Sequence, residues 1–472
     1  MTFPMNFIRR TGETCAFDKY IPAPCLRKSF QAEEKVTKAG LLICGLGFYE
    51  LFVNGERITK GALAPYISSP DDILYYDEYD LTDRMKGGEN VVGVILGNGM
   101  QNCFGASVWD FDKARWRGAP QLSLRLEISF ENGETLTVES DESFKTSPSP
   151  ILFDDLRCGE YYDARKEQKG WNEAGFDDSG WKNAEKAPLP RGEQRLCQAE
   201  PIAVSQTLTP VCVTRQGDGW LYDFGVNSAG VCELNLCGKP GQEISLEHGE
   251  HLINGELNLR NIQCVPDGYM QKDIYICKGN GAETYIPRFT YHGFRYVLVK
   301  GITPEQATAE LLTYLVMNSN LPERGGFECS DKTVNALQEM TRRSTLANFY
   351  YFPTDCPHRE KNGWMGDAAV SAEHTLLNLQ AENSYREWLH NIRKAQDDRG
   401  ALPGLVPTGG WGFSWGNGPA WDCALTWIPY YVYIYRGDKE ILRENAGAIL
   451  RYLHYLSTRI RGDGLVCFGL GD

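Results

Sequence analysis

Hydrophobic and polar positions alternate along much of the first 315 residues, a pattern typical of half-buried β-strands. Residues 121–130 show it most clearly, and residues 41–53 form a longer, nearly continuous apolar run. Both segments are followed by turn formers, Asn54-Gly55 and Asn132-Gly133, which strongly favour β-hairpins. Short strands with such closely spaced turns predict an antiparallel β-sandwich.

A segment without periodicity, residues 170–190, is rich in Asp, Gly, Lys and Pro and predicts the end of this first domain, residues 1–190. A second β pattern begins near Leu208 and closes with the apolar run 289–299. It predicts a second β-sandwich over residues 195–315.

The hydrophobic period changes to that of helices after Gly326. Tyr385, Trp388, Leu389 and Ile392, for example, fall on one helical face. The pattern predicts five helices, near residues 331–349, 367–379, 381–397, 419–435 and 438–460. Strands followed by helices indicate separate domains, so residues 320–472 are expected to form an all-α domain.

Length and charge exclude several classes of protein. The 472 residues exceed the size at which one hydrophobic core usually stops growing, about 250–300 residues. The 48 basic and 62 acidic side chains give a net charge of −14 without a basic cluster, which argues against nucleic-acid binding. No stretch approaches the roughly 20 apolar residues of a membrane span.

The 15 cysteines are scattered, and no two form a CxxC pair. The N-terminus also lacks the basic and apolar regions of a secretory signal. Reduced thiols in a cytoplasmic protein are therefore expected, rather than a disulfide framework.

Residues 353–367 form the segment most suggestive of chemistry, a loop between two predicted helices that carries Asp355, Glu360 and Asp367. Carboxylates that lie close together repel, which raises the pKa of at least one and allows it to act as a general acid. Arg359 and Lys361 oppose this effect if their side chains turn inward. A salt-bridged loop that merely caps a helix is the alternative.

Metal and nucleotide sites have little support. Cys356 and His358 could form half of a zinc site, but no second pair lies at the usual spacing, so no metal is expected. The fingerprints GxSxG, GxxxxGK[ST], HExxH and GxGxxG do not occur.

A second candidate segment, residues 411–422, contains Trp411, Trp415 and Trp421 among glycines and ends in Asp422. An aromatic-walled pocket with one carboxylate suits a sugar, which has both apolar faces and hydroxyl groups. The alternative is an irregular loop whose indoles pack against neighbouring helices.

The segment 355–367 resembles the signature around the general acid of bacterial α-L-rhamnosidases of glycoside hydrolase family 78. Gly418-Pro419-Ala420-Trp421-Asp422 is similar to the family's second sugar-contacting segment. The segments 45–55 and 159–165 resemble its N-terminal β-sandwich, and the segments 223–230 and 291–296 resemble the β domain that precedes its barrel.

This resemblance implies that Glu360 is the general acid and that no cofactor is needed. It further implies that Asp355 and Asp367 bind rhamnose hydroxyls and that Trp364 and Trp421 line the subsite. Arg359 and Asp422 complete the expected substrate-binding set.

The resemblance implies a fold of two antiparallel β-sandwiches followed by part of an (α/α)6 barrel. The family's general base is a Glu far downstream of the acid, and we expect this chain to end before it. The apolar stripe of the last predicted helix should then be partly exposed; it consists of Ile441, Leu442, Ile449, Leu450, Leu453 and Leu456.

The expected function is inverting hydrolysis of terminal non-reducing α-L-rhamnose from rhamnose-containing glycosides or oligosaccharides. Two alternatives remain open: a non-catalytic carbohydrate-binding fragment, and a hydrolase for a related deoxy-sugar. The aglycone and the oligomeric state cannot be read from the sequence.

Overall fold

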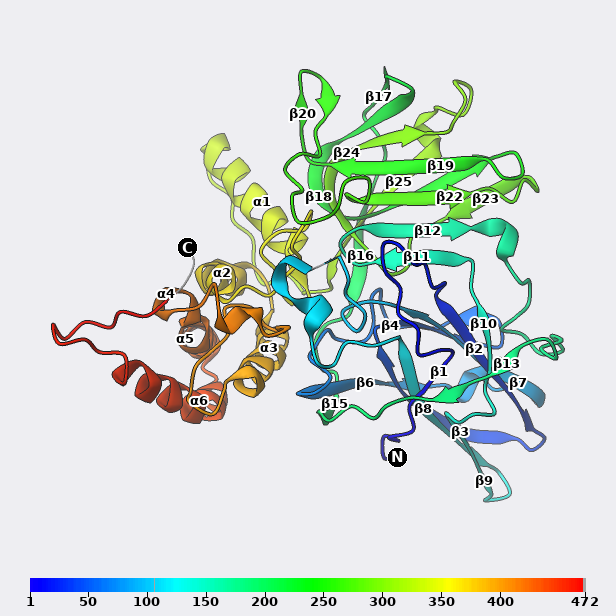
Figure 1. Cartoon of the computed structure of the whole chain (residues 1–472), viewed down its shortest axis with the longest axis horizontal. Helices are drawn as coiled ribbons and strands as arrows, with labels where there is room; N and C mark the ends of the chain where they lie inside the picture. The colour runs from blue at the N-terminus through cyan, green and yellow to red at the C-terminus, as the bar shows by residue number, and fades with distance from the viewer. Residues whose placement is uncertain (106, 470–472) are drawn as a thin grey trace.

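The computed structural model describes residues 1–105 and 107–469. It is a multidomain protein with two β blocks and a helical C-terminal part. Figure 1 shows the first β block below the second, with the helices beside both.

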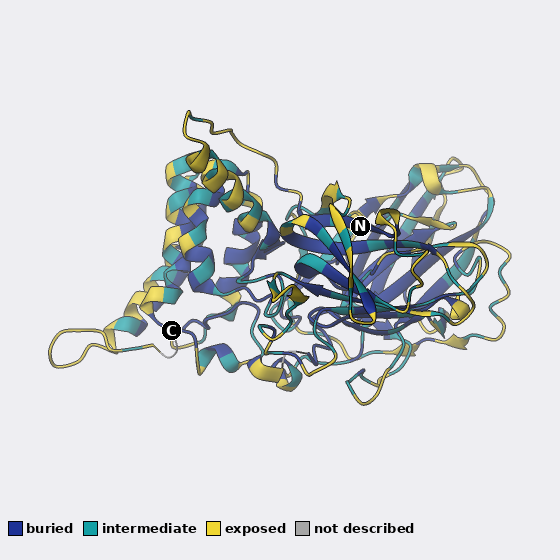
Figure 2. Ribbon diagram, turned by 90° about the horizontal axis from the view of Figure 1, so that it is seen from above, coloured by how far each residue is buried: buried dark blue, intermediate teal, exposed yellow. Residues whose placement is uncertain are grey.

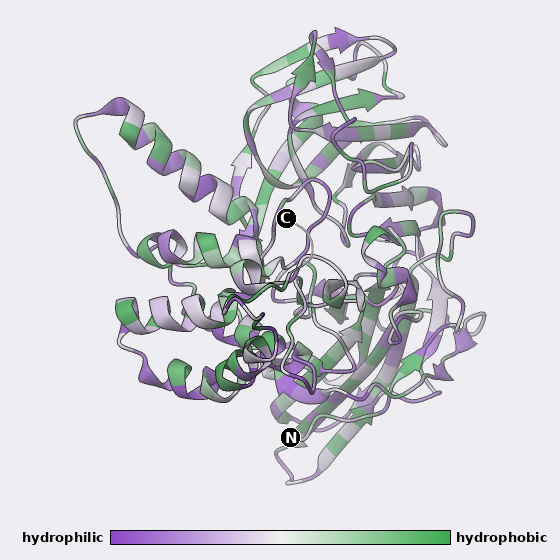
Figure 3. Cartoon of the chain, turned by 60° about the vertical axis from the view of Figure 1, so that its left-hand side comes forward, coloured by the Kyte–Doolittle hydropathy of each residue, from purple (hydrophilic) through white to green (hydrophobic). Residues whose placement is uncertain are grey.

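Two mainly antiparallel sheets build the first β block, and they enclose one hydrophobic core. The seven-stranded sheet has the order β14 (Glu185–Lys186), β1 (Ile8–Arg9), β8 (Gln121–Phe130), β3 (Val36–Leu46), β6 (Ile73–Asp80) and β15 (Glu193–Leu196), with β9 (Thr135–Glu139) beside β8. The six-stranded sheet has the order β13 (Lys182–Asn183), β10 (Lys145–Pro148), β2 (Pro24–Ala32), β7 (Gly88–Gly97), β4 (Phe48–Val53) and β5 (Glu56–Arg57). Alternating side chains of β3 and β8 meet those of β4 and β7 in the core. Figure 3 shows the mixture of hydrophobic and hydrophilic residues along these strands.

The apolar run 41–53 is two strands rather than one. It divides at Gly47, whose φ of +101° and close approach to the carbonyl of Gly97 leave no room for a Cβ atom. β3 and β4 therefore lie in different sheets. The predicted hairpin at Asn54-Gly55 is confirmed, since both residues have positive φ between β4 and β5.

The second β block contains a ten-stranded sheet and a two-stranded sheet, the latter formed by β20 (Leu252–Ile253) and β21 (Glu256–Leu257). The ten-stranded sheet has the order β11 (Ile151–Asp155), β12 (Gly159–Asp163), β22 (Lys272–Ile276), β19 (Glu243–Gly249), β24 (His292–Lys300), β18 (Gly219–Cys237), β25 (Leu312–Ser319) and β16 (Ile202–Leu208), with β17 (Cys212–Gln216) and β23 (Ala282–Tyr285) on β18.

β11 and β12 belong to this second sheet, although the sequence assigned residues 151–163 to the first domain. β12 pairs in parallel with β22, more than 100 residues further along the chain. Strand periodicity predicts that a segment is a strand but not which sheet it joins, because tertiary contacts choose its partner.

The five predicted helices are present, and the fourth is split at Cys423. They are α1 (Lys332–Ala347), α2 (Met365–Asn378), α3 (Glu382–Ala395), α4 (Pro419–Asp422), α5 (Ala424–Arg436) and α6 (Lys439–Ser457). Asp331 caps α1 and Asp438 caps α6, each accepting two backbone N–H groups. The largest core cluster contains residues of both β blocks and of the helices, so the three parts share one continuous interior.

Several apolar helix faces are open to solvent. Ile441 of α6 is buried, but Leu450 and Leu453 are 66% and 52% exposed, as expected for part of its stripe. The α1 residues Leu337 and Met340 are also exposed. Figure 2 shows that exposed residues are frequent along these helices, whereas the strands are largely buried.

No helix in the described ranges is long and apolar enough to cross a membrane. All 15 cysteines lie in those ranges, and each is an unpaired thiol.

Candidate functional site

The carboxylate-bearing loop, residues 354–364, connects a short hairpin to α2. The hairpin consists of β26 (Phe349–Tyr350) and β27 (Phe352–Pro353). Asp355 closes the loop on itself: its N–H donates to the carbonyl of Asn362 at 3.1 Å, and its Oδ1 accepts from the N–H of Asn362 at 3.0 Å. This closure brings Asp355 and Glu360 together, with one carboxylate oxygen of each within 4.8 Å of the other.

Two neighbours hold the Glu360 carboxylate. Trp364 Nε1 donates a hydrogen bond to its Oε2 at 2.8 Å, and Arg359 Nε lies 3.5 Å from its Oε1. Arg359 thus turns toward the site. Lys361 turns away and is buried among main-chain carbonyls of the β blocks.

Asp355 is the carboxyl group of the loop whose pKa is clearly raised, to about 7. Burial is the main cause, and the negative charges of Glu360 and Asp367 add to it. The Cys356 thiol donates to Asp355 Oδ2 at 3.0 Å. Asp355 is therefore about half protonated near neutral pH, so it can donate a hydrogen bond as well as accept one.

A cavity of about 680 Å³ lies over this loop, and the two candidate segments form most of its wall. Six of the seven predicted site residues line it: Asp355, Arg359, Glu360, Trp364, Asp367 and Trp421. Asp367 reaches it from the first turn of α2. The structure thus brings the two segments together, although about 50 residues separate them in the sequence.

Asp422 does not belong to the cavity wall as far as the described residues show. It is fully buried, and its Oδ2 accepts a hydrogen bond from the Tyr452 hydroxyl at 2.7 Å. Burial raises the pKa of Asp422 to about 7. α4 thus presents Trp421 to the cavity and Asp422 to α6.

The tryptophans form an aromatic wall rather than a helical core stripe. Trp364 and Trp411 meet edge to face with ring centroids 5.7 Å apart, and Trp411 lies 6.5 Å from Trp415. Trp421 packs against Gly366 of α2, where a Cβ atom would collide with the indole. The close approach explains the glycine at this position of the helix.

The β blocks contribute residues that the sequence analysis did not find. Val108 and Trp109 from the first block and Cys264 from the second line the cavity. Arg157, in the turn between β11 and β12, donates to the main-chain carbonyl of Glu360 at 2.7 Å. No local motif marks these residues, because their role depends on contacts between domains.

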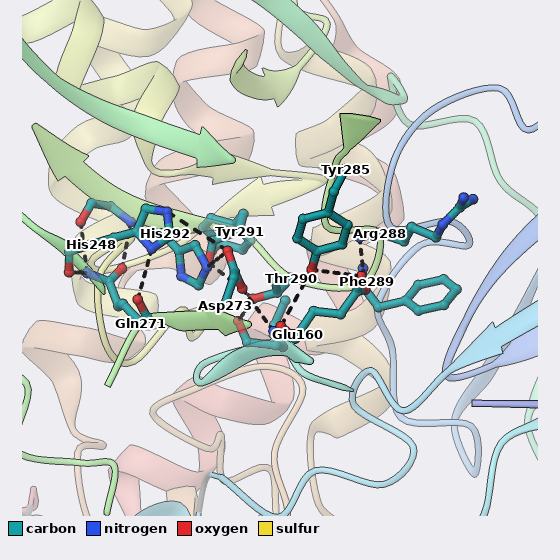
Figure 4. A network of polar contacts seen from close by, with 12 residues as sticks. Glu160, His248, Gln271, Asp273, Tyr285, Arg288, Phe289, Thr290, Tyr291 and His292 are labelled. Carbon is teal, nitrogen blue, oxygen red and sulfur yellow. Dashed lines mark hydrogen bonds and ion pairs between the residues drawn. The ribbon is translucent and has the colours of Figure 1, made fainter. Parts of the chain in front are cut away.

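Two groups of side chains have the composition of a metal site. Among the described residues, Asp355, Cys356 and Glu360 form one, and burial raises the pKa of the Cys356 thiol well above its usual value. Asp273, His248 and His292 form the other, deep in the second block (Figure 4). His292 Nε2 lies 3.0 Å from Asp273 Oδ2, and burial lowers the pKa of His248 to about 3.

Comparison with protein families gives matches along nearly the whole chain. Residues 34–206 match the α-L-rhamnosidase N-terminal domain and residues 214–318 match the bacterial α-L-rhamnosidase concanavalin-like domain. Residues 322–472 match the bacterial α-L-rhamnosidase six-hairpin glycosidase domain.

Individual relatives agree with these matches. The chain is 32% identical over 465 residues to an α-L-rhamnosidase of Formosa agariphila, covering 95% of this chain and 48% of that protein. The solved α-L-rhamnosidase of Dictyoglumus thermophilum superimposes with a TM-score of 0.88 at 34% identity, covering 96% of this chain and 51% of the other.

A third relative was solved with a sugar bound. The Streptomyces avermitilis α-L-rhamnosidase complexed with L-rhamnose gives a TM-score of 0.85 at 29% identity, covering 93% and 42% of the two chains. The present chain thus spans about half the length of the relatives that it matches.

Proposed function

Because the chain belongs to the bacterial α-L-rhamnosidase family, we propose that it acts in the hydrolysis of terminal non-reducing α-L-rhamnose from glycosides or oligosaccharides. The observation that carries this proposal is the cavity in which Glu360, Asp355 and Asp367 face an aromatic wall. Its volume of about 680 Å³ is within the usual range for small-molecule sites, about 300–1,000 Å³. The L-rhamnose complex of the Streptomyces relative supports the choice of sugar.

In this proposal Glu360 is the general acid that protonates the glycosidic oxygen as the bond breaks. Trp364 orients the carboxyl group through its indole N–H, and Arg359 lies beside the other oxygen. Asp355 and Asp367 bind sugar hydroxyls, and Trp421 lies against an apolar face of the ring. An inverting hydrolysis also needs a second carboxylate on the opposite side of the sugar, which takes the proton from the attacking water, and it requires no cofactor.

The proposed hydrolysis inverts the anomeric configuration, with a water molecule activated on the opposite side of the sugar. Such enzymes separate their two carboxyl groups by roughly 6.5–9.5 Å so that the water fits between them. Asp355 has an oxygen within 4.8 Å of Glu360 and is therefore too close to be the general base. We assign it to substrate binding.

We also propose that α1 to α6 form part of an (α/α)6 barrel with the cavity at one end. The match to the six-hairpin glycosidase domain supports this arrangement. So does the packing of α2 against α5 and of α5 against α6.

Hydrolysis of an aryl α-L-rhamnoside tests the proposal directly. The protein should release the phenol at a rate that Glu360→Gln reduces strongly, and it should bind L-rhamnose in calorimetry. Absence of both hydrolysis and L-rhamnose binding would refute the proposal.

A second candidate is a non-catalytic rhamnose-binding protein. It is favoured because the described residues around the cavity offer no assigned general base: Asp355 lies too close to Glu360 for that role. Binding of L-rhamnose without any hydrolysis, even of substrates with good leaving groups, would identify this function.

A further inference from the structure

Two buried cationic side chains tie the Glu360 loop to the β blocks. The first is Arg157, which is completely buried in the turn between β11 and β12. Its Nε donates to the Glu360 carbonyl and one Nη to Asn362 Oδ1, both at 2.7 Å. The planar guanidinium thus holds the main chain at Glu360 and the side chain of Asn362, on either side of residue 361.

The surroundings of Arg157 hold this guanidinium rigidly. Asp155 Oδ1 accepts the N–H of Arg157 at 2.9 Å, which fixes the turn from which the side chain extends. The guanidinium carbon lies 5.5 Å from the ring centroids of Trp109 and Phe111, and the other Nη donates to Cys103 Sγ. Trp109 also lines the cavity, so the same cluster supports the wall and the loop.

Lys361 is the second cation. It belongs to the loop itself, and its side chain extends from the loop into the β blocks. Its φ of +55° is unusual for a residue with a side chain, and it directs the ammonium group into the β blocks. There Nζ donates to the carbonyls of Leu156, at 2.7 Å, and of Tyr291. Burial, together with the charge of Arg157, lowers the pKa of Lys361 to about 7.

The acceptor Tyr291 belongs to a rigid region. The next residue, His292, begins β24 and lies 3.0 Å from Asp273, and Gln271 donates to the Gly293 carbonyl at 3.0 Å (Figure 4). Gly293 touches the loop: a Cβ atom there would lie 2.7 Å from Pro357 and 2.9 Å from the nitrogen of His358.

From these contacts we propose that Arg157 is a positioning residue for the general acid, with Lys361 as a second tether. Arg157 does not touch the cavity in the described structure, and it acts through the main chain of Glu360. The inference rests on the proposed function, since it assigns a role in placing the Glu360 carboxyl group. It gives the β blocks a part in the chemistry of the helical domain.

The role of Arg157 follows from the geometry of the Glu360 side chain. A glutamate side chain has three rotatable bonds, so its carboxyl position is only as well defined as the main chain that carries it. A displacement of about 1 Å in a reacting group can lower the rate about 10²-fold. Arginine suits this task because its guanidinium donates several hydrogen bonds in a fixed plane.

The test compares Arg157→Met with Arg27→Met. Arg27 is a matched control: it is equally buried in the first β block, where it pairs with Asp178 and does not contact the Glu360 loop. We expect both variants to lose thermal stability, but only Arg157→Met to lower kcat for a poor leaving group, by about 10²-fold with little change in KM. Arg157→Lys, which keeps the charge, should recover part of the loss.

A second readout does not depend on activity. The Trp364 indole N–H donates to Glu360, so its nuclear magnetic resonance signal, assigned with Trp364→Phe, reports where the carboxyl group lies. Arg157→Met should shift this signal and accelerate its hydrogen exchange, whereas Arg27→Met should leave both unchanged. This readout remains valid if the wild-type protein shows no hydrolysis, an outcome that would refute only the proposed function.

Equal indole signals in the Arg157→Met and Arg27→Met variants would overturn the positioning role. If Arg157→Met does not fold, Asn362→Ala replaces it, because it removes one acceptor of the guanidinium and leaves Arg157 in place. We expect it to shift the indole signal in the same direction, and an unchanged signal would likewise overturn the inference.

Discussion

The two loops that face each other across the cavity are held in different ways. The Glu360 loop is anchored by buried polar side chains that cross domain boundaries, Arg157 and Lys361. The tryptophan loop, residues 410–418, is held by local main-chain hydrogen bonds, such as that from Gly404 N–H to the Gly412 carbonyl, and by the ring contact of Trp364 with Trp411. Its Trp415 side chain is 47% exposed.

This difference corresponds to two kinds of task. Proton transfer requires a carboxyl group within a few tenths of an ångström of its position, which directional hydrogen bonds between rigid parts can supply. Binding an apolar sugar face requires area and shape, which indole rings on a glycine-rich backbone provide. Changes in the first loop should therefore affect mainly kcat, and changes in the second mainly KM.

Glu360→Gln should have the largest effect on activity. The amide keeps the size of the side chain and can still accept from Trp364, so folding should be nearly unchanged. Loss of the acid should lower kcat about 10²–10⁴-fold for a poor leaving group and much less for a good one. Equal losses for both leaving groups, measured with a series of aryl rhamnosides, would contradict the acid role.

Gly366→Ala tests the aromatic side of the comparison. The new methyl group would collide with the Trp421 indole and displace it from the cavity wall. We expect L-rhamnose binding to weaken about tenfold or more, with a larger change in KM than in kcat. The control is Gly447→Ala in α6, where a Cβ atom meets only the end of an arginine side chain. Unchanged affinity in Gly366→Ala would remove Trp421 from the subsite.

The sequence predicted the helical part of the fold and the residues that line the cavity better than the β topology. Hydrophobic periodicity located every helix, because α2, α3 and α5 bury a face of their own residues. It could not show that β11 and β12 join the second sheet, since that pairing joins strands about 110 residues apart.

Within the site, too, the sequence does not reveal contacts between residues that are far apart in the chain. Glu360, Asp355 and Asp367 stand in one motif and could be recognised together, whereas Arg157 is one arginine in an unremarkable turn. The burial of Asp422 could not be predicted from the sequence for a related reason. Adjacent residues of a helical turn point about 100° apart, so Trp421 can line the cavity while Asp422 is buried behind it.

Trp364→Phe should have a smaller effect than the loss of the acid itself. It removes the hydrogen bond from Nε1 to Glu360 Oε2 and keeps an aromatic ring of similar shape. A hydrogen bond to a charged group contributes roughly 1.5–3 kcal/mol, so a fall in kcat of about 10-fold is expected. The control is Trp427→Phe, at an exposed tryptophan of α5 that does not line the cavity. A higher KM without a change in kcat would instead place Trp364 in the sugar-binding wall.

The smallest effect concerns stability, and it compares one buried carboxyl group from each side of the cavity. The pKa values of Asp355 and Asp422 are both raised to about 7, mainly by burial, whereas a carboxyl group in the unfolded chain titrates near about 3.9. These two groups therefore bind more protons in the folded protein between these values, and their contribution to the free energy of unfolding falls as the pH rises from about 4 to 7. Asn resembles the protonated form at every pH, so Asp422→Asn should be nearly neutral near pH 4 and stabilising by on the order of 1–3 kcal/mol at pH 8.

Asp355→Asn should behave in the same way with a smaller gain, because Asp355 lies at the cavity wall and solvent screens its charge more than that of Asp422. Thermal unfolding of both variants at pH 4 and pH 8 measures this, and a gain that is equal at the two pH values would show that the carboxyl groups do not titrate in this range.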